Sequence, residues 1–137
     1  MKSLFIITTL LLLSNNVIAD WEHISTIKDK KIIFYADPTT IKKSDNNIKI
    51  WIMADLQEPK EIPYVIKMVF SYKNLVEYNC VQNLERLIRT IGYSKNMAEG
   101  DIIYSINESA KWKPIVYDSY SSSIFNYTCK RRKQLLQ

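Results

Sequence analysis

The sequence predicts an α+β domain in which strands come first and one helix comes last. Two observations carry this prediction. Apolar residues recur at every second position in residues 48–56 and again in 64–72, as in strands with one buried face. Near the C-terminus, Asp118 or Ser119 can cap a helix, and four cations at 130–133 fall in its final turn, where the helix dipole favours positive charge. We therefore expect a mostly β domain with one terminal helix.

The first strands are expected to form a hairpin. Residues 21–27 alternate loosely between apolar and polar, and residues 31–37 follow a polar turn at 28–30. Pro38 is expected to end the second strand, because proline has no backbone donor. The polar residues 44–47 predict the next turn.

The two middle strands carry the clearest alternation. In the first, the residues that point to one side are Ile48, Ile50, Ile52, Ala54 and Leu56. Residues 58–63 are rich in proline and charge, so we expect no regular element there. In the second strand, the apolar and aromatic side consists of Tyr64, Ile66, Met68, Phe70 and Tyr72.

The segment that follows the first cysteine fits two structures. The apolar spacing in residues 81–91 favours a helix when taken alone, whereas the alternation in 84–90 fits a strand. A turn is expected within 92–100 and a further strand at 101–106. Residues 112–115 should be extended, because a residue before proline avoids the helical region.

The first nineteen residues have the pattern of a signal peptide. One lysine precedes an apolar run at 4–13, and Val17 and Ala19 are small enough for a cleavage site before residue 20. A run of this length covers about half of the roughly 20 residues that a membrane-spanning helix needs. We therefore expect a signal peptide at 1–19, a mature domain at 20–137 and no integral membrane segment after cleavage. The product would be exported to the periplasm, the cell surface or the medium.

The chain has two cysteines, Cys80 and Cys129. In an oxidising compartment such an isolated pair predicts a structural disulfide, since a zinc site made of cysteines usually needs a second close pair. Neither cysteine lies near the expected cleavage site, so attachment of a lipid there is not expected.

The composition argues against an enzyme. His23 is the only histidine, so a nucleophilic triad or a histidine-rich metal site is excluded or confined to this one residue near the mature N-terminus. With two glycines, Gly92 and Gly100, the chain has no glycine-rich phosphate loop. We predict no catalytic residues, no metal site and no cofactor. The formal net charge of +5 favours acidic partners without identifying one.

Two groups of residues are candidates for a binding surface. Tyrosine gives a large rigid contact area with a polar tip, and a basic run can bind anionic polymers or lipids. The candidates are Tyr64, Met68 and Tyr72 on one strand face, and Lys130, Arg131, Arg132 and Lys133 on the last helix. Each group also has an alternative without a binding role. The strand face could pack beneath the helix, and the basic run could be a solvated helix end. Nucleic acid is not an expected partner, because the tyrosines lie mostly in strand patterns.

Several short motifs recur in an order known from one family. They are Trp21, residues 34–41, residues 49–55, Ser71, residues 77–80, residues 93–97 with Gly100, residues 112–115 and Cys129. This order resembles the surface-adhesin protein E family of Gram-negative bacteria. The resemblance implies a single antiparallel sheet of about six strands, with a C-terminal helix packed on it and tied by the disulfide. It also implies that residues 80–92 form a strand, against the helical spacing.

The resemblance also implies a function. We expect an exported, non-catalytic binding protein, an adhesin-like protein that recognises host, extracellular-matrix or serum proteins. The alternative is a periplasmic accessory or inhibitor protein that contacts another envelope component. A homodimer formed by strand pairing is a further arrangement that such a sheet allows.

Overall fold

The computed structural model describes residues 19–63 and 66–134, the last three of these by their backbone alone. The expected signal peptide lies almost entirely outside the described residues, and so does Tyr64. Within the described part of the chain, no helix has the length and apolar character needed to cross a bilayer.

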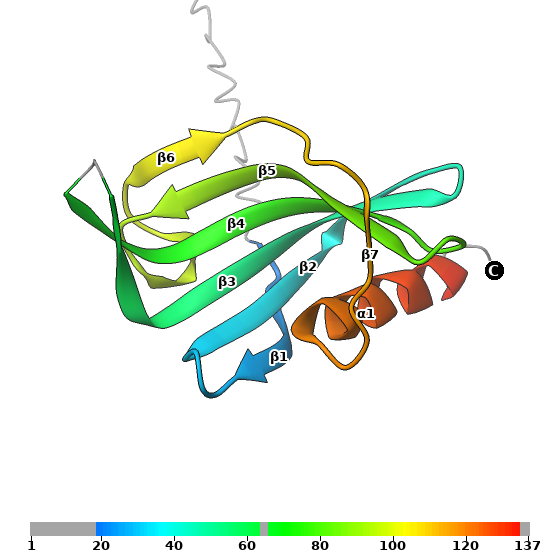
Figure 1. The fold of residues 1–137 in the computed structure, drawn as a ribbon, viewed down its shortest axis with the longest axis horizontal. Helices are drawn as coiled ribbons and strands as arrows, with labels where there is room; N and C mark the ends of the chain where they lie inside the picture. The colour runs from blue at the N-terminus through cyan, green and yellow to red at the C-terminus, as the bar shows by residue number, and fades with distance from the viewer. Residues whose placement is uncertain (1–18, 64–65, 135–137) are drawn as a thin grey trace, which may run out of the picture.

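One antiparallel sheet forms the body of the molecule (Figure 1). Its strands follow the order of the chain from one edge to the other, and a short seventh strand, β7, pairs with β5. The strands are β1 (Glu22–Ile27), β2 (Ile32–Ser44), β3 (Asn47–Ile62), β4 (Lys67–Asn79), β5 (Leu84–Tyr93), β6 (Ile102–Ile106) and β7 (Lys113–Pro114). This confirms the antiparallel sheet, and the predicted hairpin of the first two strands is also present.

The alternation in β3 predicted its buried side correctly. All five apolar residues on that side are buried, and they join side chains of β2 and β4 in one core cluster. The core members are Ile32, Phe34, Ala36, Ile48, Ile50, Ile52, Ala54, Leu56, Tyr78, Ile124 and Phe125. We call this side of the sheet the helix-side face and the other side the back face.

Helix α1 (Tyr120–Gln134) packs on one end of the helix-side face (Figure 1). The Ser119 side chain caps it, since its Oγ accepts a hydrogen bond from the Ser122 amide at 3.2 Å. Ile124 and Phe125 are buried against the sheet. The predicted disulfide is present: Cys80 follows β4, Cys129 lies on α1, and their Cα atoms are 5.7 Å apart.

Two predicted strand ends are wrong, and both involve proline. β2 continues through Pro38 to Ser44, and β3 continues through Pro59 to Ile62. Each proline lies where the pairing register shifts, in the gap between Asp37 and Lys42 or between Asp55 and Lys60. A bulge accommodates proline because it leaves a residue unpaired, so the missing donor disturbs no ladder bond.

The segment with helical spacing is the strand β5, as the family resemblance implied. Ile88 explains the misleading pattern. Leu87 pairs with Val76 and Arg89 with Leu75, so Ile88 is an extra residue in a bulge. A bulge changes which side the following residues face, and this produces apolar spacings of three and four within a strand.

The back face is covered at one end by the short 3₁₀ helix η1 (Asn96–Ala98). The Asn96 side chain donates to Asp55 Oδ1 at 3.0 Å and to the Leu56 carbonyl at 2.9 Å, and the Ala98 amide donates to Ser71 Oγ. Val69 and Ser71 are consequently buried, whereas Met68 on the apolar side of the same strand is exposed. The sequence indicated the reverse, because it gave no sign of the η1 cover.

The disulfide should contribute strongly to stability. Replacing both cysteines, Cys80→Ala with Cys129→Ala, is expected to lower the free energy of unfolding by about 3–4 kcal/mol, because the unfolded chain regains the freedom of a long closed loop. Urea unfolding of residues 20–137 measures the change. Chemically reduced wild-type protein is the control and should lose a similar amount. A loss below about 1 kcal/mol in both would contradict this account.

Candidate functional site

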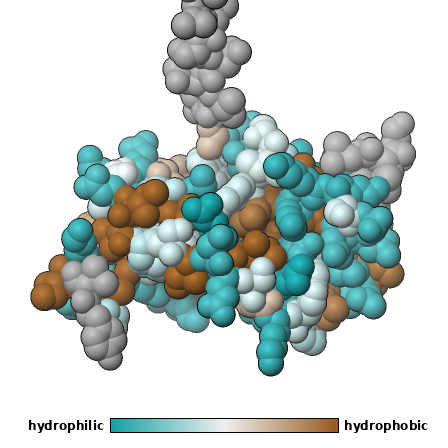
Figure 2. Space-filling view, turned by 90° about the horizontal axis from the view of Figure 1, so that it is seen from above, coloured by the Kyte–Doolittle hydropathy of each residue, from teal (hydrophilic) through white to brown (hydrophobic). Residues whose placement is uncertain are grey.

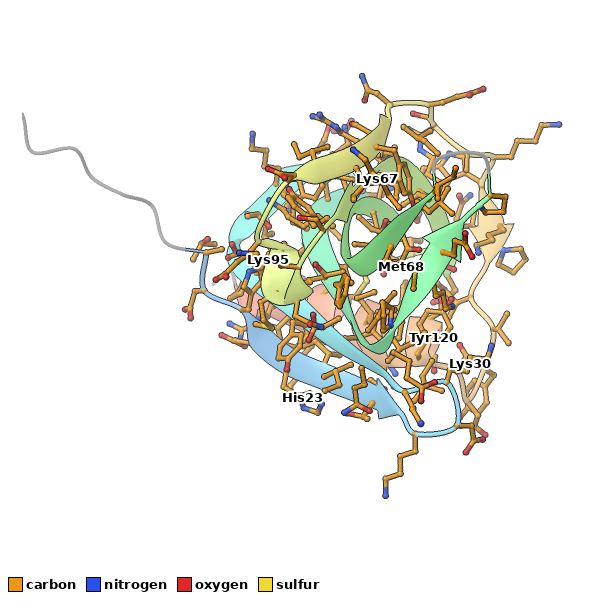
Figure 3. All side chains as sticks on the ribbon, turned by 90° about the vertical axis from the view of Figure 1, so that its left-hand side faces the viewer. His23, Lys30, Lys67, Met68, Lys95 and Tyr120 are labelled. Atoms are coloured by element: carbon orange, nitrogen blue, oxygen red, sulfur yellow. A yellow bond between two sulfur atoms is a disulfide. The ribbon has the colours of Figure 1, made fainter. Side chains whose placement is uncertain are left out.

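Helix α1 leaves part of the helix-side face uncovered, and this part is the candidate binding surface. Its residues come from β4, β5 and β6, and we call it the open face: Met68, Tyr72, Leu87, Tyr104 and Ile106. Met68, Leu87 and Ile106 are 42%, 37% and 52% exposed, which is high for apolar side chains in strands. Figure 3 shows Met68 and Tyr120 on one side of the sheet and Lys95 on the other.

Two tyrosines form the centre of the open face. In the sheet, Gly92 of β5 is paired with Tyr72 of β4 on one side and with Tyr104 of β6 on the other. The two tyrosine rings meet edge to face above it, with centroids 6.2 Å apart. The Tyr104 ring lies on Gly92 so closely that a Cβ atom there would stand 2.6 Å from its Cε1. Glycine is therefore required at this position, because any side chain would displace the ring. Burial, and then the neighbouring Tyr72, raises the pKa of Tyr104 to about 12.

A hollow lies where the open face meets the start of α1. It has a volume of 160 Å³, and its lining includes Leu87, Asn74 and Tyr120. The floor is ordered, since Thr90 donates to Asn74 Oδ1 at 2.9 Å and the Tyr120 ring stacks on Phe34 with centroids 4.6 Å apart. The open face thus combines apolar surface, tyrosine hydroxyls and a shallow recess, which are typical of protein-binding surfaces.

The predicted basic group lies elsewhere. Lys130 and Arg131 follow Cys129, which is bonded to the residue after β4, whereas Met68 lies near the start of β4, about 40 Å away along a straight strand. The side chains of Arg132 and Lys133 are outside the described residues. Of the residues whose side chains the structure describes, Met68 and Tyr72 therefore lie apart from Lys130 and Arg131.

Arg131 belongs to a contact between α1 and β1. Its Nη2 is 2.5 Å from Glu22 Oε2, which also accepts a hydrogen bond from the Tyr127 hydroxyl at 2.5 Å. The guanidinium stacks on the Tyr127 ring at 4.7 Å. Burial and the bond to Glu22 raise the pKa of Tyr127. Arg131 is thus engaged within the molecule, whereas Lys130 is exposed.

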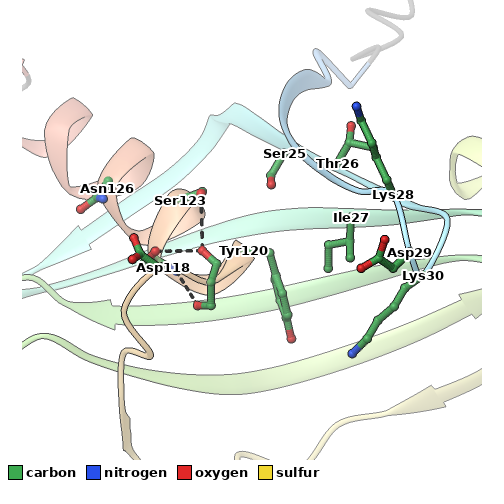
Figure 4. A pocket seen from close by; sticks show the side chains of 12 residues that line it. Ser25, Thr26, Ile27, Lys28, Asp29, Lys30, Asp118, Tyr120, Ser123 and Asn126 are labelled. Atoms are coloured by element: carbon green, nitrogen blue, oxygen red, sulfur yellow. Dashed lines mark hydrogen bonds between the residues drawn. The ribbon is translucent and has the colours of Figure 1, made fainter.

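A second hollow lies between the β1–β2 turn and the start of α1 (Figure 4). It is open, has a volume of 770 Å³, and is lined mainly by polar and charged side chains, among them Ser25, Asp29, Lys30, Asp118 and Asn126. In the described residues no three His, Cys, Asp or Glu side chains gather as metal ligands would. His23 lies on β1, with its ring nitrogen 2.9 Å from the Thr26 hydroxyl.

Three residues of the open face were missed at the sequence level: Leu87, Tyr104 and Ile106. Their contribution depends on which strands pair, and Leu87 lay in the segment with helical spacing. One signal was available, because a glycine inside a predicted strand often marks the close approach of another group. Gly92 could therefore have indicated a large side chain above it.

Comparison with known proteins decides the family. The family model for surface-adhesin protein E matches residues 21–130. The chain belongs to this family. Among curated protein sequences, none matches the chain.

Solved structures of Haemophilus influenzae protein E have the same fold as this chain. One is 13% identical, with a TM-score of 0.61, over 82% of this chain and 86% of that one. A second crystal form is 14% identical, with a TM-score of 0.61, over 80% and 87%. At this level of identity the likeness shows the fold alone.

The pKa of Tyr104 gives a test of the geometry at the centre of the open face. Ultraviolet titration should show a tyrosine ionising at about pH 12, and Tyr104→Phe should remove that component. Because the pKa is raised on folding, the stabilisation linked to neutral Tyr104 is complete below about pH 10 and is lost as the pH rises to about 12. In urea both proteins should titrate near the ordinary value of about 10. A wild-type titration without the late component would contradict the packing of the two rings.

Proposed function

We propose that this protein is an exported, non-catalytic, adhesin-like protein that binds a host matrix or serum protein through the open face. Membership of a surface-adhesin family supports the class of function. The choice of surface rests on one observation: three exposed apolar side chains surround two half-buried tyrosines on the part of the helix-side face that α1 does not cover.

The open face has the composition expected of a protein-binding surface. Exposed Met68, Leu87 and Ile106 surround the Tyr72 and Tyr104 pair, so that apolar contact area lies beside hydroxyl groups. Figure 2, which views the molecule from the β6 side, shows apolar side chains gathered there. Such patches on a folded protein generally mark an interaction site.

The β6 strand adds a second means of contact. It is the last of the described strands in the order of the sheet, so none of them pairs with its outer edge, which can accept an added strand. A segment of the partner, or β6 of a second copy, would extend the sheet in this way. Ile102 and Ile106 are both exposed on this strand and would be covered by such an addition.

A single charge placed in the open face tests the proposal. Mature protein with Ile106→Asp should retain at least about tenfold less protein from human serum or a basement-membrane extract than wild type, because a carboxylate in a desolvated apolar contact is costly. Retention is measured by surface plasmon resonance on immobilised mature protein.

Val81→Asp is the matched control, since Val81 is also an exposed aliphatic residue, 63% accessible, but lies in the turn after β4. It should bind like wild type. Equal loss in both variants would refute the open face as the binding surface. Retention of a bacterial envelope protein, with none from serum or matrix, would favour the accessory or inhibitor function instead.

A further inference from the structure

The three tryptophans of the chain lie on the back face or at its border, and each is stacked against a cation. Trp51 lies between the buried residues Ile50 and Ile52 of β3, so its side chain points away from α1. Lys73 Nζ is 4.9 Å from the centroid of Trp51 and 5.9 Å from that of Trp21. These distances are typical of cation–π contacts.

The third tryptophan repeats this arrangement further along. Arg86 Cζ is 4.5 Å from the ring centroid of Trp112, and Arg86 pairs with Glu77 on β4, which places it on the back face. We call this surface the tryptophan face and define it by Trp21, Trp51, Lys73, Arg86, Arg89 and Trp112.

The residues of the tryptophan face are held at fixed spacing by the sheet. Trp51 pairs with Leu75, and Leu75 with Arg89, so the backbones of Trp51 and Arg89 are two strands, or about 10 Å, apart. Lys73 lies two residues from Leu75 on β4, the strand between β3 and β5. The cations therefore form a row across strands β4 and β5 rather than a loose surface cluster.

Within the described part of the chain, two of these cations have no acidic partner at ion-pair distance. Arg86 is paired, because its Nη2 is 2.6 Å from Glu77 Oε2. The ion pairs found among the described residues include neither Lys73 nor Arg89. Burial lowers the pKa of Lys73, and the charge of Asp37 opposes this effect. The Asp37 carboxylate is itself engaged locally, because its Oδ1 accepts a hydrogen bond from the Thr39 amide.

Arg89 is the more informative of the two. Its Nη2 donates weakly to Ser105 Oγ at 3.4 Å, and its Nε is buried with no hydrogen-bond partner. A buried donor without an acceptor is costly and rare in folded proteins. The buried Nε itself is out of reach of a ligand, but an oxyanion bound beside the guanidinium group of Arg89 would supply the missing negative charge.

We propose that the tryptophan face binds an anionic polysaccharide, with sulfate or carboxylate groups of the chain pairing with Lys73 and Arg89. The ligand presents oxyanions at regular intervals on a stiff chain, as the row of cations requires. Between them it presents sugar rings, whose apolar faces can cover the indole edges. This function is independent of the open face, which lies on the other side of the sheet.

Two other anionic ligands fit less well. Single-stranded nucleic acid binds by stacking bases on aromatic faces, but Lys73 and Arg86 already occupy faces of these indoles. A flat anionic membrane is best met by protruding lysines, whereas Lys73 and Arg89 are half-buried between neighbouring side chains.

Heparin is the probe for the test, with neutral dextran as the uncharged comparison. Wild-type mature protein should bind heparin and not dextran, with a change in tryptophan fluorescence and weaker binding at higher salt. The double variant Lys73→Met with Arg89→Met should bind heparin at least about tenfold more weakly. The matched control, Lys30→Met with Lys130→Met, removes two exposed cations elsewhere and should change affinity less than about twofold.

Each other outcome overturns the proposal. If the wild-type protein does not bind heparin, the proposal is refuted. This result needs no variant, so it holds even if the double variant misfolds. An equal or larger loss in the control pair would assign binding to net charge or to the basic end of α1. Tighter binding to single-stranded DNA, or to vesicles containing phosphatidylserine, would assign the face to those ligands instead.

Discussion

Helix α1 can cover only part of the sheet on which it packs. Its fifteen residues rise about 22 Å, whereas the sixteen residues of β3 extend about 50 Å when straight. Ile124 and Phe125 are buried against the core, and the bond from Cys129 to Cys80 fixes the helix at the far end of β4. The rest of the sheet must be covered by other means or remain accessible, and the surfaces described above follow from this limit.

The uncovered parts of the sheet are stabilised in three different ways. At one end of the back face, Asn96 joins η1 to Asp55, so a loop replaces a second helix. Further along the back face, tryptophans and cations stack on one another. On the open face, the rings of Tyr72 and Tyr104 pack across Gly92. Each solution leaves chemical groups in contact with solvent, and these groups are the ones available to partners.

Local sequence patterns predicted correctly those elements that have the same surroundings along their whole length. The alternation in β3 identified its buried side because one core covers all of it. Residue type narrowed the cap of α1 to Asp118 or Ser119, and the structure decides for Ser119. Prediction failed where segments distant in the sequence determine the local structure. Pro38 lies in a bulge that only the pairing with β3 reveals, and β5 gained a helical spacing from the bulge at Ile88. The open face was found through Met68 and Tyr72 only, since β5 and β6 supply the remainder.

The disulfide holds on the sheet a helix that the core cannot do without. The core around Ile48 and Ile50 is completed only when the apolar residues of α1 dock on it, and Cys129 lies on the same helix. Until then the sheet exposes a long apolar surface, which is the condition under which intermediates aggregate. Docking of α1 therefore shields this apolar surface, and the bond between Cys129 and Cys80 holds the helix in place on the sheet.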